Sequence, residues 1–387
     1  MKLYEVSNFI KKVINIFLVV VILLSSYIYI RPFVSQIFQT IEPEQAPEIP
    51  YKVDRIKFTI DPNLSYDVSQ SRITYLGNPE TQWANFATKR LPLYEYTFSS
   101  IEDIDYTPRA KQIALALGYD NLNQIDNAEI SNKYKWVKNG IVFEIDKITK
   151  RMIQIPTESN FLAYKQYLSS GNFVSEESPK SFVNNFLGVS GRFRGNELNE
   201  LDLEPNFLRF EGNNLIESNN INSELSYVKV FRKLSNFKVV SKRYEFPQIY
   251  FYVTSLRPEI QTNFPNYRLI HFKLNKTEYI PSYNNYEFDL LPLTVAVEDI
   301  KNKRFVISDI KFRGDSFGAI PNPQSIKIQN ITFDTFELGY YDNFEETVQN
   351  LNLQPIYIFK GNVELDSGVR GRVTAYVPAL DVKYFKN

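Results

Sequence analysis

Two serines stand three residues before a lysine, a spacing that can serve nucleophilic hydrolysis. The sequence reads Ser235-Asn-Phe-Lys238 at one place and Ser308-Asp-Ile-Lys311 at another. On a helix, this Ser-x-x-Lys spacing puts a lysine base one turn from a serine nucleophile. Both pairs fall in segments that we predict as strand or turn, where the spacing does not bring the two groups together. Neither pair is followed by a Lys-Thr-Gly triplet. We therefore interpret both Ser-x-x-Lys matches as chance occurrences and not as catalytic motifs.

Paired carboxylates are the second kind of chemistry that the sequence offers. Glu102 and Asp103, with Asp105 close behind, have the residue types that hydrolyse glycosidic bonds. They stand directly before Thr107-Pro108, where a helix is predicted to begin. Carboxylates stabilise the positive end of a helix. We therefore interpret this acidic group as a helix-terminal feature.

The remaining candidate groups have simple structural explanations. Asp342, Glu345 and Glu346 form an acidic loop that we interpret as a solvated turn. His271 is the single histidine and there is no cysteine, which removes cysteine nucleophiles and the usual zinc sites. It lies in a predicted strand at 268–273, so we interpret it as a surface or inter-strand residue rather than a general base. We predict no catalytic, cofactor-binding or metal-ligating residue, no cofactor, and no enzyme activity.

A capped helix followed by short strands is the unit that would position these residues. Thr107-Pro108 opens a helical run that ends at Gly118. Threonine would cap the free amides, proline fits the first turn, and glycine takes the left-handed closing conformation. Asn139-Gly140 between alternating apolar runs is a strong hairpin signal. The strands predicted here are 134–137, 141–145 and 151–155.

Two further helices are predicted towards the C-terminus. Ser178-Pro179 opens one that closes at Gly188, and another covers 294–303. The chain holds 26 tyrosines and 30 phenylalanines, mostly in the strands around these helices, where strand propensity and cross-strand packing explain them. The same side chains would also suit an aromatic groove for a glycan. The further predicted strands are 206–210, 225–234, 237–246, 248–254, 267–273, 279–290, 304–312, 325–338, 353–364 and 371–377.

The apolar run at residues 13–30 predicts the cellular location of the protein. It carries no ionised side chain and is preceded by Lys2, Lys11 and Lys12. As a helix it would be about 27 Å long, close to the thickness of a bilayer core. The lysines predict a cytoplasmic tail at 1–12 and an extracytoplasmic remainder. A cleaved signal peptide fits less well because the run is long and lacks a small-x-small site; a buried core helix is the third interpretation.

The rest of the chain divides by composition. Residues 31–50 form a juxtamembrane segment and a proline- and glutamate-rich spacer, 51–175 a first α+β module, and 176–387 a second α+β region of one or two modules. The predicted fold class is α+β: a single N-terminal transmembrane helix followed by antiparallel sheet modules, each packed with a helix. Lys+Arg and Asp+Glu are equal at 44 each and no basic stripe occurs, so a nucleic-acid partner is not expected.

This layout resembles the YycH/YycI-type regulators and the wider PepSY-like group of bacterial proteins. The resemblance rests on the helix at 107–118 with its Asn139-Gly140 hairpin, and on the terminal runs Gly339-Tyr-Tyr341, Gln354-Pro-Ile-Tyr-Ile-Phe-Lys-Gly361 and Ala375-Tyr-Val-Pro378. It implies a protein that associates, through its anchor and its outer domain, with a cell-wall sensor kinase and adjusts its activity. It also implies that there is no catalytic residue.

Three functions follow as hypotheses. The first is a single-pass, membrane-anchored extracytoplasmic interaction or regulatory protein, whose partner is another membrane protein such as an envelope sensor kinase or a wall-synthesis complex. The second is an envelope module that binds glycan or peptide. The third is a cell-envelope hydrolase using serine or carboxylates. The sequence does not identify a small-molecule ligand.

Overall fold

The computed structural model divides the chain into two compact units, Met1–Lys52 and Val53–Asn387. The residues that the structure describes are 15, 17–21, 25, 51–56, 58, 65–97, 106–119, 132–138, 140–156, 172–193, 195–255, 268–312, 314–319, 322, 326–342 and 352–386.

In the first unit, the described residues 15, 17–21 and 25 are helical and exposed. No helix within the described part of the chain has the length and apolar character needed to cross a membrane. Most of the predicted anchor at 13–30 lies outside the described residues. The predicted tail at 1–12 and the spacer at 31–50 lie wholly outside them.

The helices of Val53–Asn387 differ from prediction mainly at their ends. Thr107 is the first helical residue rather than the residue before the helix, and its Oγ1 lies 3.0 Å from the Tyr134 hydroxyl. Gly118 follows the same helix at a φ of 86°, as predicted. The next helix passes Gly188 and ends at Gly191, whose φ is 66°. The α-helices described in this unit are α2 (Pro79–Asn85), α3 (Thr107–Ala116), α5 (Glu177–Ser190) and α6 (Leu293–Lys301).

Strands outnumber helices in the described part of this unit. Gly140 takes a φ of 74° in the two-residue hairpin loop predicted from Asn139-Gly140, and Lys138 pairs with Ile141 across it. The strands are β1 (Arg72–Tyr75), β2 (Arg90–Pro92), β3 (Tyr94–Thr97), β4 (Lys133–Lys138), β5 (Ile141–Asp146), β6 (Met152–Pro156), β7 (Leu201–Glu211), β8 (Asn214–Glu217), β9 (Leu225–Leu234), β10 (Phe237–Val240), β11 (Ile249–Thr254), β12 (Leu269–Leu274), β13 (Glu278–Pro281), β14 (Glu287–Asp289), β15 (Val306–Phe312), β16 (Ile328–Tyr341), β17 (Asn352–Leu365) and β18 (Arg370–Pro378).

Within the described residues, 16 of these strands join in one mixed sheet. Its main path is β13-β3-β17-β16-β10-β9-β11-β12-β6-β5-β4, with β1, β15, β18, β7 and β8 attached beside it. Both β1 and β10 pair with β16 in parallel. The predicted fold class is therefore wrong: within the described residues, the strands join in one mixed sheet instead of forming separate antiparallel modules. The parallel pairs join distant segments, such as Arg72 with Asn330, and local hairpin signals do not report such pairs.

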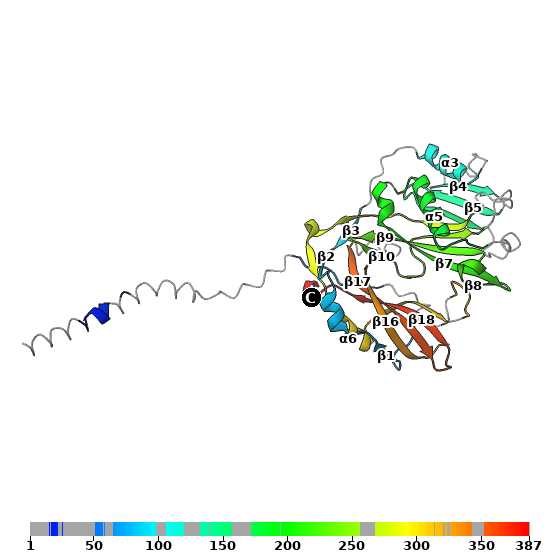
Figure 1. The fold of residues 1–387 in the computed structure, drawn as a ribbon. Coiled ribbons are helices and arrows are strands. Elements are labelled where there is room, and N and C mark those ends of the chain that lie inside the picture. The colour runs from blue at the N-terminus through cyan, green and yellow to red at the C-terminus, as the bar shows by residue number, and fades with distance from the viewer. Residues whose placement is uncertain are drawn as a thin grey trace, which may run out of the picture. The chain divides into compact units, whose positions relative to one another are not determined.

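The helices cover two separate parts of this sheet (Figure 1). α3 and α5 pack on the part that contains β4, β5, β11 and β12, where Phe186 contacts Phe251 and Phe272. α6 packs with β1 and β18, and its Val297 and Ile300 share a core with β16 and β17. Each part therefore has one face buried under helices and a second face left for other contacts.

The two parts meet at the β9–β10 hairpin. Ser235 and Asn236 form its two-residue turn, both at positive φ, 49° and 69°, as in a type I′ turn. β10 pairs with β9 on one side and with β16 on the other. Beside this junction, an apolar cluster contributed by both parts fills the space between them. Its buried members are Phe231, Val240, Tyr244, Tyr341, Ile356, Ile358 and Tyr376.

Candidate functional site

A polar groove opens between the two parts of the sheet, on the faces that the helices do not cover. Its volume is about 440 Å³. β7, β8, β9 and the loop after β10 supply one wall, and β15 to β18 supply the other. The lining residues are Glu204, Asn206, Glu217, Lys229, Tyr244, Glu245, Asp309, Lys311, Asp334, Lys360, Gly361, Asn362, Arg372, Val373 and Thr374.

Alternation along the strands explains why this face is polar. Successive side chains of a strand point to opposite faces. In β17, Phe359 and Val363 belong to the core beneath α6, while Lys360 and Asn362 line the groove. β18 repeats the pattern, with Thr374 in the groove between two core residues. The same strands thus build the apolar core on one face and the groove on the other.

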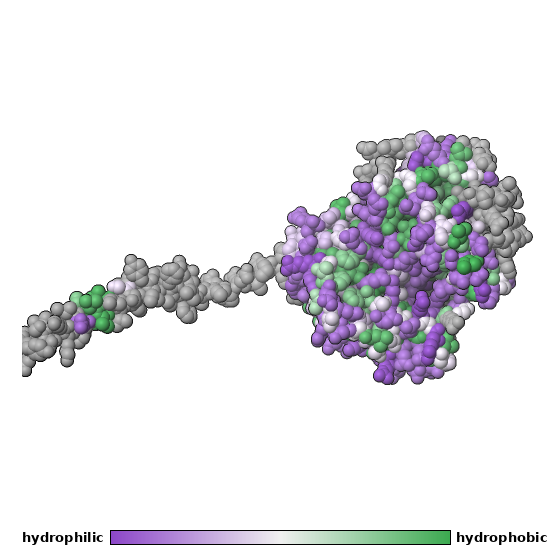
Figure 2. Space-filling model, in the orientation of Figure 1, coloured by the Kyte–Doolittle hydropathy of each residue, from purple (hydrophilic) through white to green (hydrophobic). Residues whose placement is uncertain are grey.

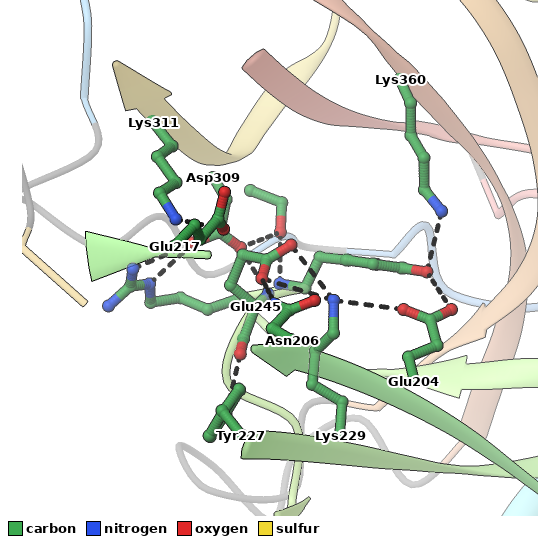
Figure 3. A network of polar contacts seen from close by, with 12 residues as sticks. Glu204, Asn206, Glu217, Tyr227, Lys229, Glu245, Asp309, Lys311 and Lys360 are labelled. Atoms are coloured by element: carbon green, nitrogen blue, oxygen red, sulfur yellow. Dashed lines mark hydrogen bonds and ion pairs between the residues drawn. The ribbon is translucent and has the colours of Figure 1, made fainter. Parts of the chain in front are cut away.

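Lys229 is the central cation of the groove (Figure 3). Its side chain is 5% exposed, and its Nζ lies 3.1 Å from Glu204 and 3.2 Å from Glu245. Burial acts to lower the pKa of Lys229, but the two carboxylates outweigh this effect and raise it. Lys238 of β10 also contacts Glu204. We call these four residues, Glu204, Lys229, Lys238 and Glu245, the paired cluster.

Glu204 stays ionised because of its two lysines. Burial acts to raise the pKa of this carboxyl, but Lys229 and Lys238 outweigh it and lower the pKa to about 2. The Tyr244 hydroxyl donates a hydrogen bond to Glu204 at 3.0 Å and accepts one from Lys360 Nζ at 2.8 Å. Tyr244 therefore links the carboxylate of one wall to the lysine of the other.

Asp309 ties β15 to the loop after β10. Its Oδ1 lies 3.0 Å from Nε of Arg243, and its Oδ2 accepts the backbone N–H of Glu245 at 2.9 Å. Burial raises the pKa of Asp309 to about 6, although Arg243 acts against it. These bonds hold the loop that carries Tyr244 and Glu245 against the second wall.

Three groove residues lie across neighbouring strands and stay exposed. Asp334 is on β16, Asn362 on β17 and Arg372 on β18, and Asn362 pairs directly with Arg372. The Asn362 amide donates to Asp334 Oδ2 at 3.5 Å. Among the described residues, Arg372 has neither an ion pair nor a side-chain hydrogen bond. We call these three residues the exposed row.

The structure separates the members of both Ser-x-x-Lys pairs. Ser235 Oγ lies 2.8 Å from the Tyr94 hydroxyl in the hairpin turn, while the Lys238 ammonium contacts carboxylates. Ser308 Oγ accepts the backbone N–H of Tyr244 at 2.8 Å, and Lys311 is paired with Glu217. Neither lysine contacts its serine, so neither pair has the geometry of a serine nucleophile with a lysine base.

Two other candidates have structural roles. His271 is an inter-strand residue, as interpreted: its ring stacks on Tyr252 with centroids 5.3 Å apart, and burial lowers its pKa to about 4. The solvated-turn interpretation of Asp342 is wrong. Asp342 is buried. Its carboxylate accepts hydrogen bonds from the hydroxyls of Tyr96 at 2.5 Å and Tyr279 at 2.7 Å, and these bonds replace the water that a solvated turn would provide. Glu102, Asp103, Asp105, Glu345 and Glu346 lie outside the described residues.

Sequence reasoning missed the groove because its residues come from eight segments. A signal was nevertheless present: Lys229, Asp309 and Lys360 are charged residues within strands that also carry several buried apolar side chains. A charge in such a place needs a partner from elsewhere in the fold. No group of metal-ligating side chains occurs in the part of the chain that the structure describes.

Comparison with protein-family models gives no match for this chain, and comparison with curated proteins gives none either. The resemblance to YycH/YycI-type regulators therefore stays a prediction.

Proposed function

We propose that this protein is a non-catalytic binding protein whose groove holds a polar ligand from the cell envelope. The observation that carries the proposal is the groove itself. It has the volume of a small-ligand site, about 440 Å³. The charged residues of its lining come from seven strands and one loop. The ion pairs of the paired cluster hold part of this lining in position. Such a lining is pre-organised for binding, because its buried charges are already compensated before a ligand arrives.

The surface around the groove supports a polar ligand. The face of the folded unit seen in Figure 2 is mostly hydrophilic, with apolar residues in scattered patches. Exposed apolar side chains such as Leu76, Ile148 and Val174 come from separate segments. Isolated apolar residues are normal on a protein surface and do not mark a docking face.

The sequence supports the cellular setting. Residues 13–30 and the lysines before them favour attachment to a membrane with the folded unit outside the cytoplasm. The resemblance to YycH/YycI-type regulators suggests that the partner is a membrane protein, such as a sensor kinase or a wall-synthesis complex. Crosslinking in native membranes followed by mass spectrometry would identify it. Ligand occupancy of the groove would then be the signal that this partner receives.

Thermal unfolding of the full-length protein with a panel of short peptides and wall-glycan fragments tests the proposal. A ligand that binds the native state raises the unfolding temperature by mass action. In the variant Asn362→Trp, the indole fills the groove from an exposed position, and the shift should disappear. Ser367→Trp, in the exposed turn after β17, is the matched control and should keep it. A shift that survives Asn362→Trp would place binding elsewhere.

A further inference from the structure

We infer that the ligand of the groove is a short peptide with free termini, its ammonium group at Asp334 and its carboxylate at Arg372. This inference rests on the proposed function and names the ligand class. The charges of the paired cluster already satisfy one another, so they offer little to an incoming ion. Asp334 and Arg372 are exposed, line the groove and carry opposite charges.

The strand register sets the distance between the two recognition groups. Asn362 pairs with Arg372 of β18 and with Thr332 of β16, while Asp334 stands in a β-bulge two residues further along β16, so Asp334 and Arg372 lie two strands apart and out of register. Neighbouring strands are spaced by about 4.8 Å, which puts the two backbones at least about 10 Å apart. An extended peptide rises by about 3.3–3.6 Å per residue. About three residues therefore span the row from its acidic to its basic end.

Each position in the exposed row suits one part of such a peptide. A guanidinium binds a carboxylate through two parallel hydrogen bonds, which favours Arg372 as the site of the C-terminus. A carboxylate such as Asp334 accepts hydrogen bonds from an ammonium group. Between them, Asn362 has both an amide donor and an amide acceptor, which match the backbone groups of a middle residue.

The aromatic content of the groove favours a peptide over a glycan. Sugar rings are commonly held by stacking on open aromatic faces. Tyr244 is the one aromatic residue in the described lining. Its ring has the Lys229 Nζ 4.9 Å and the Lys360 Nζ 4.3 Å from its centroid, and it packs against Phe231 at 5.1 Å. The ring is therefore already in contact with protein groups, and the described lining offers no open aromatic platform.

Isothermal titration calorimetry on the full-length protein tests this assignment with tri-alanine as the probe. Tri-alanine with an acetylated N-terminus and tri-alanine amide serve as blocked forms. Each block should weaken binding about tenfold or more, because a charge-assisted hydrogen bond is lost. Arg372→Gln should remove the preference for a free carboxylate and keep the preference for a free amine. Asp334→Asn should do the reverse.

The controls separate this inference from the function on which it rests. Arg370→Gln, on the same strand but outside the groove lining, should bind tri-alanine as the unaltered protein does. If blocked and free peptides bind equally and Asn362→Trp still removes binding, end recognition is wrong and the groove function stands. The same conclusion follows if tri-alanine fails to bind and an N-acetylglucosamine trimer binds in the groove. If neither probe binds, both proposals fail.

Discussion

Three members of the paired cluster and the whole exposed row line one groove, but the two sets differ in burial and in bonding. Lys229 is 5% exposed and contacts two carboxylates, whereas Arg372 is exposed and has no ion pair or side-chain hydrogen bond within the described residues. Buried charges that satisfy one another hold a shape, and losing one leaves the other uncompensated. Exposed charges contribute little to stability, so they are free to serve recognition. Charged residues of one groove thus have two separate roles: the buried ones hold its shape, and the exposed ones are available to bind a ligand.

Removing the central cation should have the largest effect on stability. In Lys229→Met, Glu204 and Glu245 lose their shared partner, and the free energy of unfolding should fall by about 3 kcal/mol. Urea unfolding followed by circular dichroism measures this change. Lys133→Met breaks the exposed pair with Glu144 and should cost less than about 1 kcal/mol. Equal losses in the two variants would show that the paired cluster has no special role.

Acid should weaken the paired cluster through Glu204. Its pKa is lowered from 4.5 to about 2 in the folded protein. Its contribution to stability is therefore fully present above pH 4.5 and is lost as the pH falls towards 2, on the order of 3 kcal/mol. The stability difference between the unaltered protein and Glu204→Gln should shrink over this range. A difference that stays constant with pH would contradict the assignment.

Asp309 should show the opposite slope with a somewhat smaller amplitude. Its pKa is raised from 3.8 to about 6, so the folded state holds its proton more tightly than the unfolded state. Stability therefore falls as the pH rises through this window, by about 3 kcal/mol, because the burial cost outweighs the effect of Arg243. Asp309→Asn should lack this decline in urea titrations at pH 4 and pH 6. A steeper decline in the variant would refute the prediction.

The exposed row should contribute least to stability. Arg372→Gln and Asp334→Asn should each change the free energy of unfolding by less than about 0.5 kcal/mol, because surface substitutions away from packed features are usually neutral. Differential scanning calorimetry at neutral pH measures this. A loss as large as that of Lys229→Met would mean that the row is structural, and the division between the two sets would disappear.

Local signals predicted some elements well and the groove not at all. Pro108, Gly118 and the Asn139-Gly140 pair marked a helix and a hairpin, because their backbone preferences act within a few residues. The parallel pairing of β1 with β16 depends on segments more than 250 residues apart, Arg72 with Asn330. No local pattern encodes such a register. Glu204 and Lys229 are direct partners in the antiparallel pair of β7 with β9, whereas Lys360 of β17 reaches Tyr244 only because the larger sheet brings the two walls together.

The pairing of early with late strands also sets the order in which the molecule can fold. β1 pairs with β16, β3 pairs with β17 as well as with β13, and Val53 bridges to Phe385 near the other end of the chain. Contacts between distant segments close large loops before they gain stability, which slows folding. Residues 53–97 cannot complete their part of the sheet until residues 326–385 have been synthesised. The nascent chain thus lacks β16 and β17, and with them the longest strand pair of the sheet, until synthesis is almost complete.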